Sequence, residues 1–240
     1  MKLTIITVAY NSEQFFGECL DFLKSIKGEG NVECILIDGG SKDNTLMLAK
    51  KAGCFDLIVS EPDKGISHAF NKGVFLASSD YICFLNSDDY YNKDSFICLL
   101  NYLHKTNSDI IYCDSCQING REKKLKKRYL GPGWISLPFT FGACVFKKKL
   151  FEIYGVFDIN KKIAMDVDFV LRFWDEESIL CEYLNKTLLV QRGGGVSDIQ
   201  RVKGYIEYMK SAKSRYGSVL SCFGFIRKYM AHITYKYGLR

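Results

Sequence analysis

The sequence predicts an α/β protein whose central sheet is mainly parallel and is covered by helices on both faces. A chain of 240 residues with 48% hydrophobic and 25% charged residues has the composition of a globular domain with a sizeable core. In the first half, short apolar runs alternate with helical stretches of about ten residues, which is typical of βαβ units. Polar residues follow these runs, at the strand ends where parallel sheets bind ligands.

The first half of the chain contains the regular alternation. Its predicted strands cover residues 3–9, 32–38, 55–60, 81–85 and 109–113. Its predicted helices cover residues 12–27, 43–52, 66–77 and 94–104. Ser12 is positioned to cap the first of these helices. The basic run at residues 121–128 lies between predicted strands and is interpreted as an exposed hairpin loop.

The second half contains the same kinds of element in a less regular order. Strands are predicted at residues 139–146, 179–183 and 188–191, and helices at residues 147–154, 165–174 and 198–216. No linker-like stretch divides the chain. We therefore expect one domain over residues 1–200, followed by a basic helical segment over residues 201–240.

Composition excludes several classes of protein. The longest apolar runs are far shorter than the roughly 18–20 residues that a membrane-spanning helix needs. The N-terminus lacks a signal-peptide cleavage site, and the ten cysteines stand mostly within apolar stretches, which favours a cytoplasmic protein with reduced thiols. Cys113 and Cys116 form one close pair, but no second pair completes a zinc site. The absence of a dinucleotide fingerprint and of a Walker loop argues against hydride transfer and ATP hydrolysis.

The C-terminal segment carries most of the net positive charge. Its last forty residues hold nine Lys or Arg and one acid, Glu207. Apolar residues recur there at helical spacing, on a narrow stripe made of Phe223, Ile226, Met230, Ile233 and Tyr237. Two interpretations stay open: the helix packs on its own domain with a basic face in solvent, or it lies on an anionic membrane surface. No nucleic-acid-binding module is present.

The adjacent acids Asp88 and Asp89 follow the apolar strand at residues 81–85. Two neighbouring carboxylates repel each other unless a cation or strong donors compensate. Oxygen ligands of this kind suit Mg²⁺ or Mn²⁺, above all with phosphate oxygens completing the coordination shell. The alternative is an acidic turn that caps the following helix.

Two further sites carry carboxylates at positions suited to chemistry. Asp38 ends a strand and is followed by two glycines, so it can accept hydrogen bonds from a nucleobase or ribose that approaches the backbone closely. Asp166 and Asp168 open a helix, where the dipole favours the ionised form that a general base requires. A spacing of two residues puts Asp166 and Asp168 on different sides of the helix, so we expect them to have different roles. Arg172 could pair with either acid or with a phosphate. Each of these acids could instead cap a helix.

These motifs together resemble the family 2 glycosyltransferases, which have the GT-A nucleotide-diphospho-sugar transferase fold. The resemblance rests on four segments that occur in the order Thr7–Asn11, Ile37–Thr45, Leu85–Asp89 and Asp166–Arg172. The segment Ser60–Gly73 narrows it to bacterial enzymes that build O-antigen (lipopolysaccharide), capsule and exopolysaccharide. The resemblance is dense over residues 1–90, sparser to about residue 197, and absent from the tail.

The resemblance implies roles for individual residues. It implies nucleotide contacts for Thr7, Ala9, Asn11, Asp38, Lys64, Asn71, Asn86 and Ser87. It implies a divalent cation, Mn²⁺ or Mg²⁺, at Asp88 with help from Asp89, and a catalytic base at Asp166. It suggests diphosphate or acceptor contacts for Asp168, Arg172, Gly194 and Gly195. Asn86 stands where relatives carry an acid, so metal binding depends more on Asp88.

The function that the resemblance implies is an inverting, metal-dependent transfer of a hexose. The expected donor is UDP-glucose or UDP-galactose, bound by residues 1–115, and the expected acceptor is an undecaprenyl-diphosphate-linked sugar, bound by residues 116–200. Two alternatives stay open. A sugar-nucleotide pyrophosphorylase would usually show a glycine-rich N-terminal loop in place of Ala9–Glu13, and an inactive nucleotide-sugar-binding protein would tolerate loss of Asp88 and Asp166.

Overall fold

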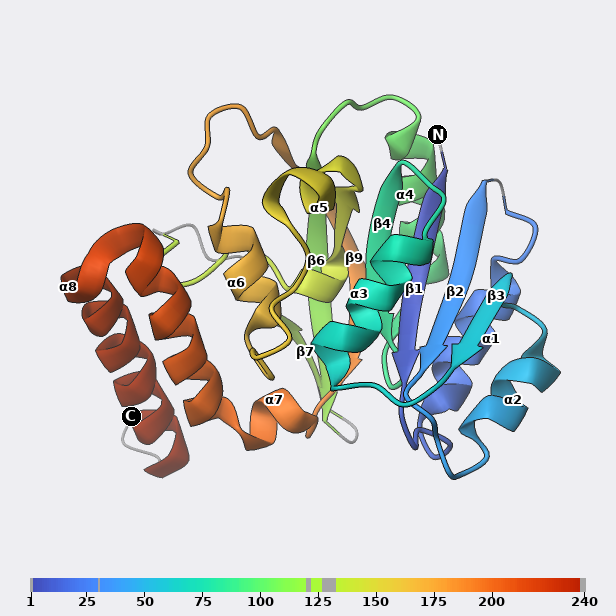
Figure 1. Ribbon diagram of the computed structural model, residues 1–240, viewed down its shortest axis with the longest axis horizontal. Helices are drawn as coiled ribbons and strands as arrows, with labels where there is room; N and C mark the ends of the chain where they lie inside the picture. Colours follow the sequence, from blue (N-terminus) through green and yellow to red (C-terminus); the bar gives the residue numbers. More distant parts are fainter. Residues whose placement is uncertain (1, 30, 120–121, 127–132, 238–240) are drawn as a thin grey trace.

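The computed structural model describes residues 2–29, 31–119, 122–126 and 133–237 and contains one mixed sheet flanked by helices (Figure 1). The strands are β1 (Leu3–Ala9), β2 (Val32–Asp38), β3 (Leu57–Ser60), β4 (Tyr81–Asn86), β5 (Tyr90–Tyr91), β6 (Ile110–Asn119), β7 (Glu122–Lys126), β8 (Cys144–Lys147) and β9 (Cys181–Arg192). The helices are α1 (Phe16–Ser25), α2 (Thr45–Ala52), α3 (Ile66–Leu76), α4 (Lys93–Leu103), the short 3₁₀ helix η1 (Phe141–Ala143), α5 (Lys149–Tyr154), α6 (Met165–Leu171), α7 (Val196–Ile199) and α8 (Arg201–Tyr237).

The sheet runs in the order β3-β2-β1-β4-β8-β6-β9-β5, with β7 paired to β6. The four strands β3, β2, β1 and β4 are parallel, and their register aligns Ala9 with Asp38 and Asp38 with Ser60. The polar residues at the carboxyl ends of these strands therefore meet at one edge. Beyond β4 the sheet is mixed, because β8 is antiparallel to both β4 and β6. The predicted α/β class is confirmed.

The core lies on both faces of the sheet because its strands are apolar throughout, as buried parallel strands are. Along β1, Leu3 and Ile5 face a cluster that includes side chains of α1 and α4. Ile6 and Val8 face a second cluster that includes side chains of α3, α5, α6 and α8. The second half of the chain therefore completes the same core as the first half.

Several predicted elements have other bounds in the structure. The first helix begins at Phe16 rather than at Ser12, whose hydroxyl bonds to Ser87 at 2.8 Å instead of capping the helix. The predicted strand at residues 139–146 begins as η1 and becomes β8 only at Cys144. The two strands predicted at 179–183 and 188–191 form the single strand β9, which a polar stretch between them concealed.

The basic run at residues 121–128 was expected to be a loop, but its residues 122–126 form β7, paired antiparallel to β6. Strand pairing satisfies the backbone there although the side chains are charged. Residues 121, 127 and 128 lie outside the described part of the chain.

The long helix α8 is a helical hairpin (Figure 1). Gly217 has a φ of 79°, a conformation that other residues rarely adopt, and it separates a first leg from a second leg that folds back. A Cβ at Gly224 would lie 2.3 Å from the carbonyl oxygen of Trp134, so only glycine allows this close approach to the domain. No helix in the described ranges has the length and apolar character that crossing a bilayer requires.

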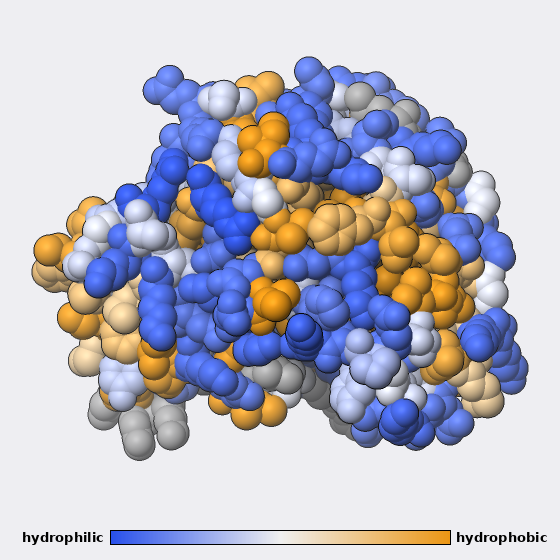
Figure 2. Space-filling model, in the orientation of Figure 1, coloured by the Kyte–Doolittle hydropathy of each residue, from blue (hydrophilic) through white to orange (hydrophobic). Residues whose placement is uncertain are grey.

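The apolar stripe of the C-terminal segment faces outward. Phe223, Ile226 and Met230 are 63%, 55% and 54% exposed, and Figure 2 shows hydrophobic atoms over the α8 end of the molecule. The interpretation that this stripe packs on the domain is therefore wrong for these three residues. The side chain of Tyr237, assigned to the same stripe, lies outside the described part of the chain.

Candidate functional site

The ends of β1, β2 and β3 are joined by hydrogen bonds around Asp38. The Asp38 side chain is fully buried and accepts hydrogen bonds from the backbone and hydroxyl of Ser41 and from the hydroxyl of Ser60 at 2.6 Å. The Ser41 hydroxyl in turn accepts the backbone N–H of Asn11 at 2.9 Å. Asp38 therefore organises the loop that was expected to contact a nucleoside, rather than presenting a free carboxylate.

The other residues expected near the nucleoside differ in exposure. Thr7 and Ala9 are buried in β1, and the Thr7 hydroxyl is without a hydrogen-bond partner. Asn11 is exposed with a φ of 49°, and its side-chain oxygen accepts the backbone N–H of Lys42 at 2.8 Å. Lys64 is also exposed. Of these four, Asn11 and Lys64 are the side chains that a bound nucleotide can reach directly.

Two expected nucleotide contacts are already engaged within the protein. The buried amide of Asn71 donates to the carbonyl of Phe157 at 2.8 Å and accepts its N–H at 2.9 Å. The buried hydroxyl of Ser87 bonds to Ser12. Both side chains satisfy buried polar groups, as interior side chains must. They hold α3 and the end of β4 in place, and their nucleotide contacts stay a prediction.

The acid pair lies at the carboxyl end of β4. Asp89 is buried and accepts the backbone N–H of Arg192 at 3.0 Å and the amide of Asn86 at 3.4 Å. Asp88 is half-buried, and no side chain in the described ranges bonds to its carboxylate. Burial raises the pKa of Asp88, while burial and the neighbouring Asp88 charge raise the pKa of Asp89 to about 7. Asp89 therefore ties β4 to β9, and Asp88 is the acid free to bind a ligand.

The residues around Asp88 fit a divalent cation. The side-chain oxygen of Asn86 is buried without a hydrogen-bond partner beside the two carboxylates. Mg²⁺ and Mn²⁺ take oxygen ligands and often use only one or two carboxylates, with substrate phosphates and water supplying the rest. The described residues contain no cluster of three or more His, Cys, Asp or Glu able to hold a metal by itself. A site that relies on substrate phosphates and water for its other ligands is consistent with this. Asp88 and Asn86 would hold the ion.

The segment after β9 reaches the same edge. Arg192 contacts Asp89, and Gly194 and Gly195 follow Arg192 by two and three residues in the chain. Gly194 has a φ of 88°, and its N–H donates to Asp198 at 3.1 Å. No atom lies within 4 Å of the Cβ position at either glycine, so a ligand can approach the backbone there.

Asp166 lies in a cavity of about 250 Å³ on the second half of the sheet. The cavity is lined by Ser136, Leu137, Phe139, Phe141, Ile163, Ala164, Asp166, Val167, Arg201, Gly204, Tyr205, Tyr208 and Lys228. Phe141 belongs to η1, which precedes β8, and its ring packs on that of Phe84 in β4 at 5.1 Å. The antiparallel register of β4 and β8 places η1 beside the end of β4. The fold therefore places one wall of the Asp166 cavity next to β4, the strand that the acid pair follows.

The Asp166 carboxylate is half-buried and accepts the N–H of Val167 at 2.8 Å. Burial raises the pKa of Asp166 to about 6, against the lowering effect of the Lys228 charge. A carboxylate with a pKa near 6 is ionised at neutral pH and is a better proton acceptor than an ordinary aspartate, which suits a general base.

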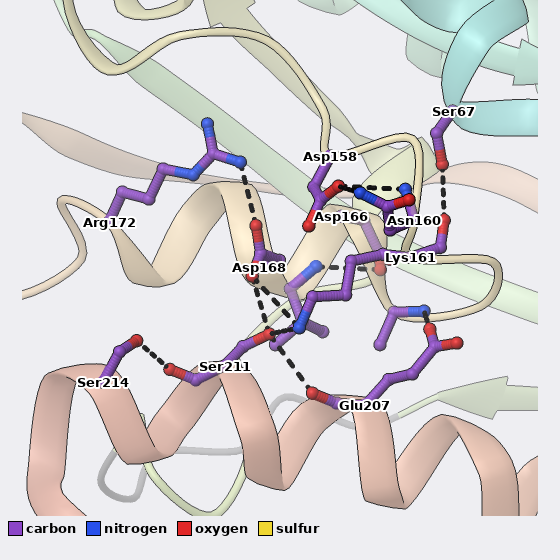
Figure 3. Close-up of polar contacts among 12 residues, drawn as sticks. Ser67, Asp158, Asn160, Lys161, Asp166, Asp168, Arg172, Glu207, Ser211 and Ser214 are labelled. Carbon is purple, nitrogen blue, oxygen red and sulfur yellow. Dashed lines mark hydrogen bonds and ion pairs between the residues drawn. The ribbon is translucent and has the colours of Figure 1, made fainter.

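Asp168, two residues further, has a different role (Figure 3). It pairs with Arg172 at 2.8 Å and with Lys161 at 3.5 Å, and it accepts the hydroxyl of Ser211 from α8 at 2.7 Å. Hydrogen bonds and the charge of Arg172 lower the pKa of Asp168. Arg172 also donates to two backbone carbonyls. Asp168 and Arg172 therefore fasten α6 to its surroundings, and their expected diphosphate or acceptor contacts stay a prediction.

Glu207 on α8 has a role at the start of α6 that the sequence did not predict. Its carboxylate accepts the backbone N–H groups of Ile163 and Ala164, both at 2.9 Å, just before α6 begins (Figure 3). The first N–H groups of a helix lack internal partners, and Ala164 supplies no side-chain cap. Glu207 therefore fixes the helix start that carries Asp166.

Comparison with known proteins agrees with this geometry. A model of the family described as "Glycosyl transferase family 2" matches residues 4–168. A PGL/p-HBAD biosynthesis glycosyltransferase of Mycobacterium bovis is 26% identical over 193 residues, which cover 76% of this chain and 73% of that protein. The cholesterol galactosyltransferase of Borreliella burgdorferi is 32% identical over 164 residues, which cover 65% and 43%.

Solved structures show the same fold. S. aureus TarS 1–349 in complex with UDP-GlcNAc has a TM-score of 0.71 at 17% identity, with 96% of this chain and 73% of that chain covered. The mannosyltransferase PcManGT of Pyrobaculum calidifontis, in complex with GDP-Man and Mn²⁺, has a TM-score of 0.68 at 15% identity, with 93% and 69% covered. These likenesses confirm the predicted GT-A architecture.

Proposed function

The chain belongs to glycosyl transferase family 2, and from this premise we propose that it transfers a hexose from a nucleoside diphosphate sugar to a hydroxyl of a lipid-linked acceptor. The observation that carries the proposal is the position of Asp166, a half-buried carboxylate in a cavity whose wall residue Phe141 packs against Phe84 of β4. The nucleotide would be bound by residues 1–115 and the acceptor by residues 116–200. The two acidic sites then belong to the two substrates.

The reaction that this arrangement favours is a single displacement. Asp166 takes the proton from the acceptor hydroxyl while that oxygen attacks the anomeric carbon. The bond from that carbon to the donor diphosphate breaks, and its electron pair leaves with the nucleoside diphosphate. Attack opposite the leaving group inverts the anomeric configuration. Base catalysis of this kind contributes on the order of 10²–10⁴-fold.

The diphosphate gains negative charge as it leaves, and in this proposal Asp88 is the residue that would hold a cation against that charge. A divalent cation bound there supplies Lewis-acid stabilisation of the leaving group without a proton donor. Asp89 holds the turn in place through the backbone of Arg192, and Gly194 and Gly195 leave room for phosphate oxygens. UDP-glucose and UDP-galactose are the proposed donors.

We expect a panel of sugar nucleotides to separate this function from its alternatives. The protein should be stabilised against heat by one nucleoside diphosphate series, and should slowly hydrolyse the matching sugar nucleotide in the presence of Mn²⁺ or Mg²⁺. Thermal shift and nucleotide release are the measurements. Stabilisation without hydrolysis or transfer would indicate an inactive binding protein, and formation of a sugar nucleotide from a nucleoside triphosphate would indicate a pyrophosphorylase.

The proposed acceptor requires access to a membrane surface, and α8 carries side chains that could bind such a surface. The exposed stripe of Phe223, Ile226 and Met230 lies on the second leg, next to the exposed base Arg227. A helix with an exposed apolar stripe and basic neighbours binds at the interface of anionic membranes. We propose that this stripe holds the protein at the lipid surface during synthesis of a bacterial surface polysaccharide, such as O-antigen.

Replacement of Phe223 and Ile226 by serine should reduce binding to vesicles of anionic phospholipid by about tenfold, since each large apolar side chain contributes about 1.5–3 kcal/mol when fully buried and less at an interface. Co-sedimentation with vesicles is the measurement. The matched control replaces Phe75 and Leu76 of α3, which are also exposed, by serine. Equal loss in both double variants would contradict a specific role for α8.

A further inference from the structure

Lys228 of α8 projects into the Asp166 cavity. Its ammonium nitrogen lies 3.1 Å from the ring centroid of Tyr208 and 6.0 Å from that of Tyr205, both on the first leg of the hairpin. Lys228 and Arg201 line the same cavity as Asp166. The fold-back of α8 at Gly217 turns Lys228 inward, towards this cavity.

Among the described residues, the ammonium group of Lys228 has aromatic rings but no carboxylate as close neighbours. No carboxylate in the described ranges lies within 4.0 Å of its nitrogen, and Asp166 acts on it only from a longer distance. Burial lowers the pKa of Lys228 to about 7. The tyrosine rings offset part of the desolvation cost, since the face of an aromatic ring attracts a cation. An anion in the cavity would offset the rest.

Arg201 adds a second positive charge to the cavity wall. It pairs with Asp198 at 2.8 Å, yet it also forms part of the cavity wall. With Asp166 ionised, the charged side chains that line the cavity are two bases and one acid. A neutral sugar gains little from such a wall, whereas a sugar that carries a phosphate group gains charge-assisted hydrogen bonds.

The size and lining of the cavity restrict its occupant. About 250 Å³ is below the range of roughly 300–1,000 Å³ found for pockets that enclose drug-sized ligands. One sugar-sized group with its substituent fits a space of this size. Phe139, Phe141 and Tyr205 supply apolar ring surface next to the charged groups.

We propose that Lys228, assisted by Arg201, binds a phosphate group of the acceptor and thereby places the acceptor hydroxyl at Asp166. This inference rests on the proposed function and adds the charge of the acceptor and the residues that recognise it. The phosphate can belong to a lipid-linked sugar diphosphate or to a soluble sugar phosphate, because both present the same oxygen atoms to an ammonium group.

Binding can be measured without transfer. Trp174 packs edge-on against Phe139 of the cavity at 5.5 Å, so intrinsic tryptophan fluorescence reports on occupancy. Farnesyl diphosphate, glucose 1-phosphate and the neutral alcohol farnesol are titrated in EDTA, which removes cation-dependent binding at Asp88. Wild-type protein should bind at least one of the two phosphates more tightly than farnesol.

The Lys228→Gln variant should bind that phosphate at least about tenfold more weakly, because a hydrogen bond to a charged group contributes about 1.5–3 kcal/mol. Lys228→Arg should retain most of the affinity. Arg201→Gln, which leaves the tyrosine cage intact, should weaken binding about threefold or more and gives a second test if Lys228→Gln does not fold. Lys213→Gln removes an exposed charge from the same helix and should bind as wild type.

The outcomes separate the sources of the phosphate and the two levels of the proposal. Binding of farnesyl diphosphate alone indicates a lipid-linked acceptor, and binding of glucose 1-phosphate indicates a soluble one. Absence of phosphate binding in the wild type, or equal affinity in Lys228→Gln, would overturn the inference. Asp88→Asn should still bind the phosphate probe while losing donor hydrolysis, so failure of the proposed function remains distinguishable from failure of this subsite.

Discussion

Replacement of Asp166 by asparagine is expected to lower the rate of sugar transfer by about 10²–10⁴-fold, the usual contribution of a general base. The amide is nearly the same size as the carboxylate and can still accept the N–H of Val167, which bonds to Asp166 at 2.8 Å. The helix start and the donor site should therefore persist. Transfer kinetics and nucleotide binding by calorimetry are the measurements, with kcat reduced and nucleotide affinity unchanged.

The pH dependence of the wild-type enzyme gives an independent check on Asp166. A base must be ionised to act, and burial places the pKa of Asp166 at about 6. The value of kcat/KM should therefore fall tenfold per pH unit below this pH, a limb that Asp166→Asn should lack. Asp175→Asn, which removes an exposed acid just beyond α6, serves as control. Unchanged turnover in Asp166→Asn would reassign the base.

Replacement of Asp88 by asparagine is expected to reduce transfer by about 100-fold or more, the loss that follows removal of one electrostatic contact to a developing charge. Asp88 is the less engaged acid of the pair, since Asp89 already accepts the N–H of Arg192. The variant should keep its fold, lose its response to Mn²⁺ and Mg²⁺, and require higher donor concentrations. Transfer rates across a cation titration, with EDTA as the zero point, are the measurement.

Asp94→Asn provides the matched control for Asp88. It removes a nearby acid from the exposed first turn of α4 and should change stability slightly but not cation dependence. If wild-type rates proved equal with Mn²⁺ and with EDTA, the acid pair would be a structural turn rather than a cation site.

The sequence predicted the parallel half of the fold well for a physical reason. Buried parallel strands require continuous apolar runs, so β1 and β2 were predicted with the bounds that the structure has. Elements whose limits depend on contacts with distant residues were predicted less well. Ser12 is a residue type that often caps helices, but its hydroxyl bonds to Ser87, which follows β4.

In the candidate site too, features set by local sequence were predicted and features set by distant contacts were not. The acids Asp88 and Asp166 were recognised from motifs that sit next to apolar strands and at a helix start, where local sequence determines exposure. The partners of Asn71 and Asp168 were not predictable, because Phe157 and Ser211 lie far from them in the chain. In α8, glycine at position 217 within a helical pattern was a signal of a break that the sequence analysis did not use.

The sequence by itself determined the α/β class, the order of the first strands and the acids at their carboxyl ends, because apolar periodicity and strand-end chemistry are local properties. The tertiary structure alone decided which polar side chains are already satisfied by the protein, and that the second leg of α8 turns Lys228 towards Asp166 and leaves Phe223 exposed. Those features depend on contacts between residues that are distant in sequence, and local patterns carry no record of them.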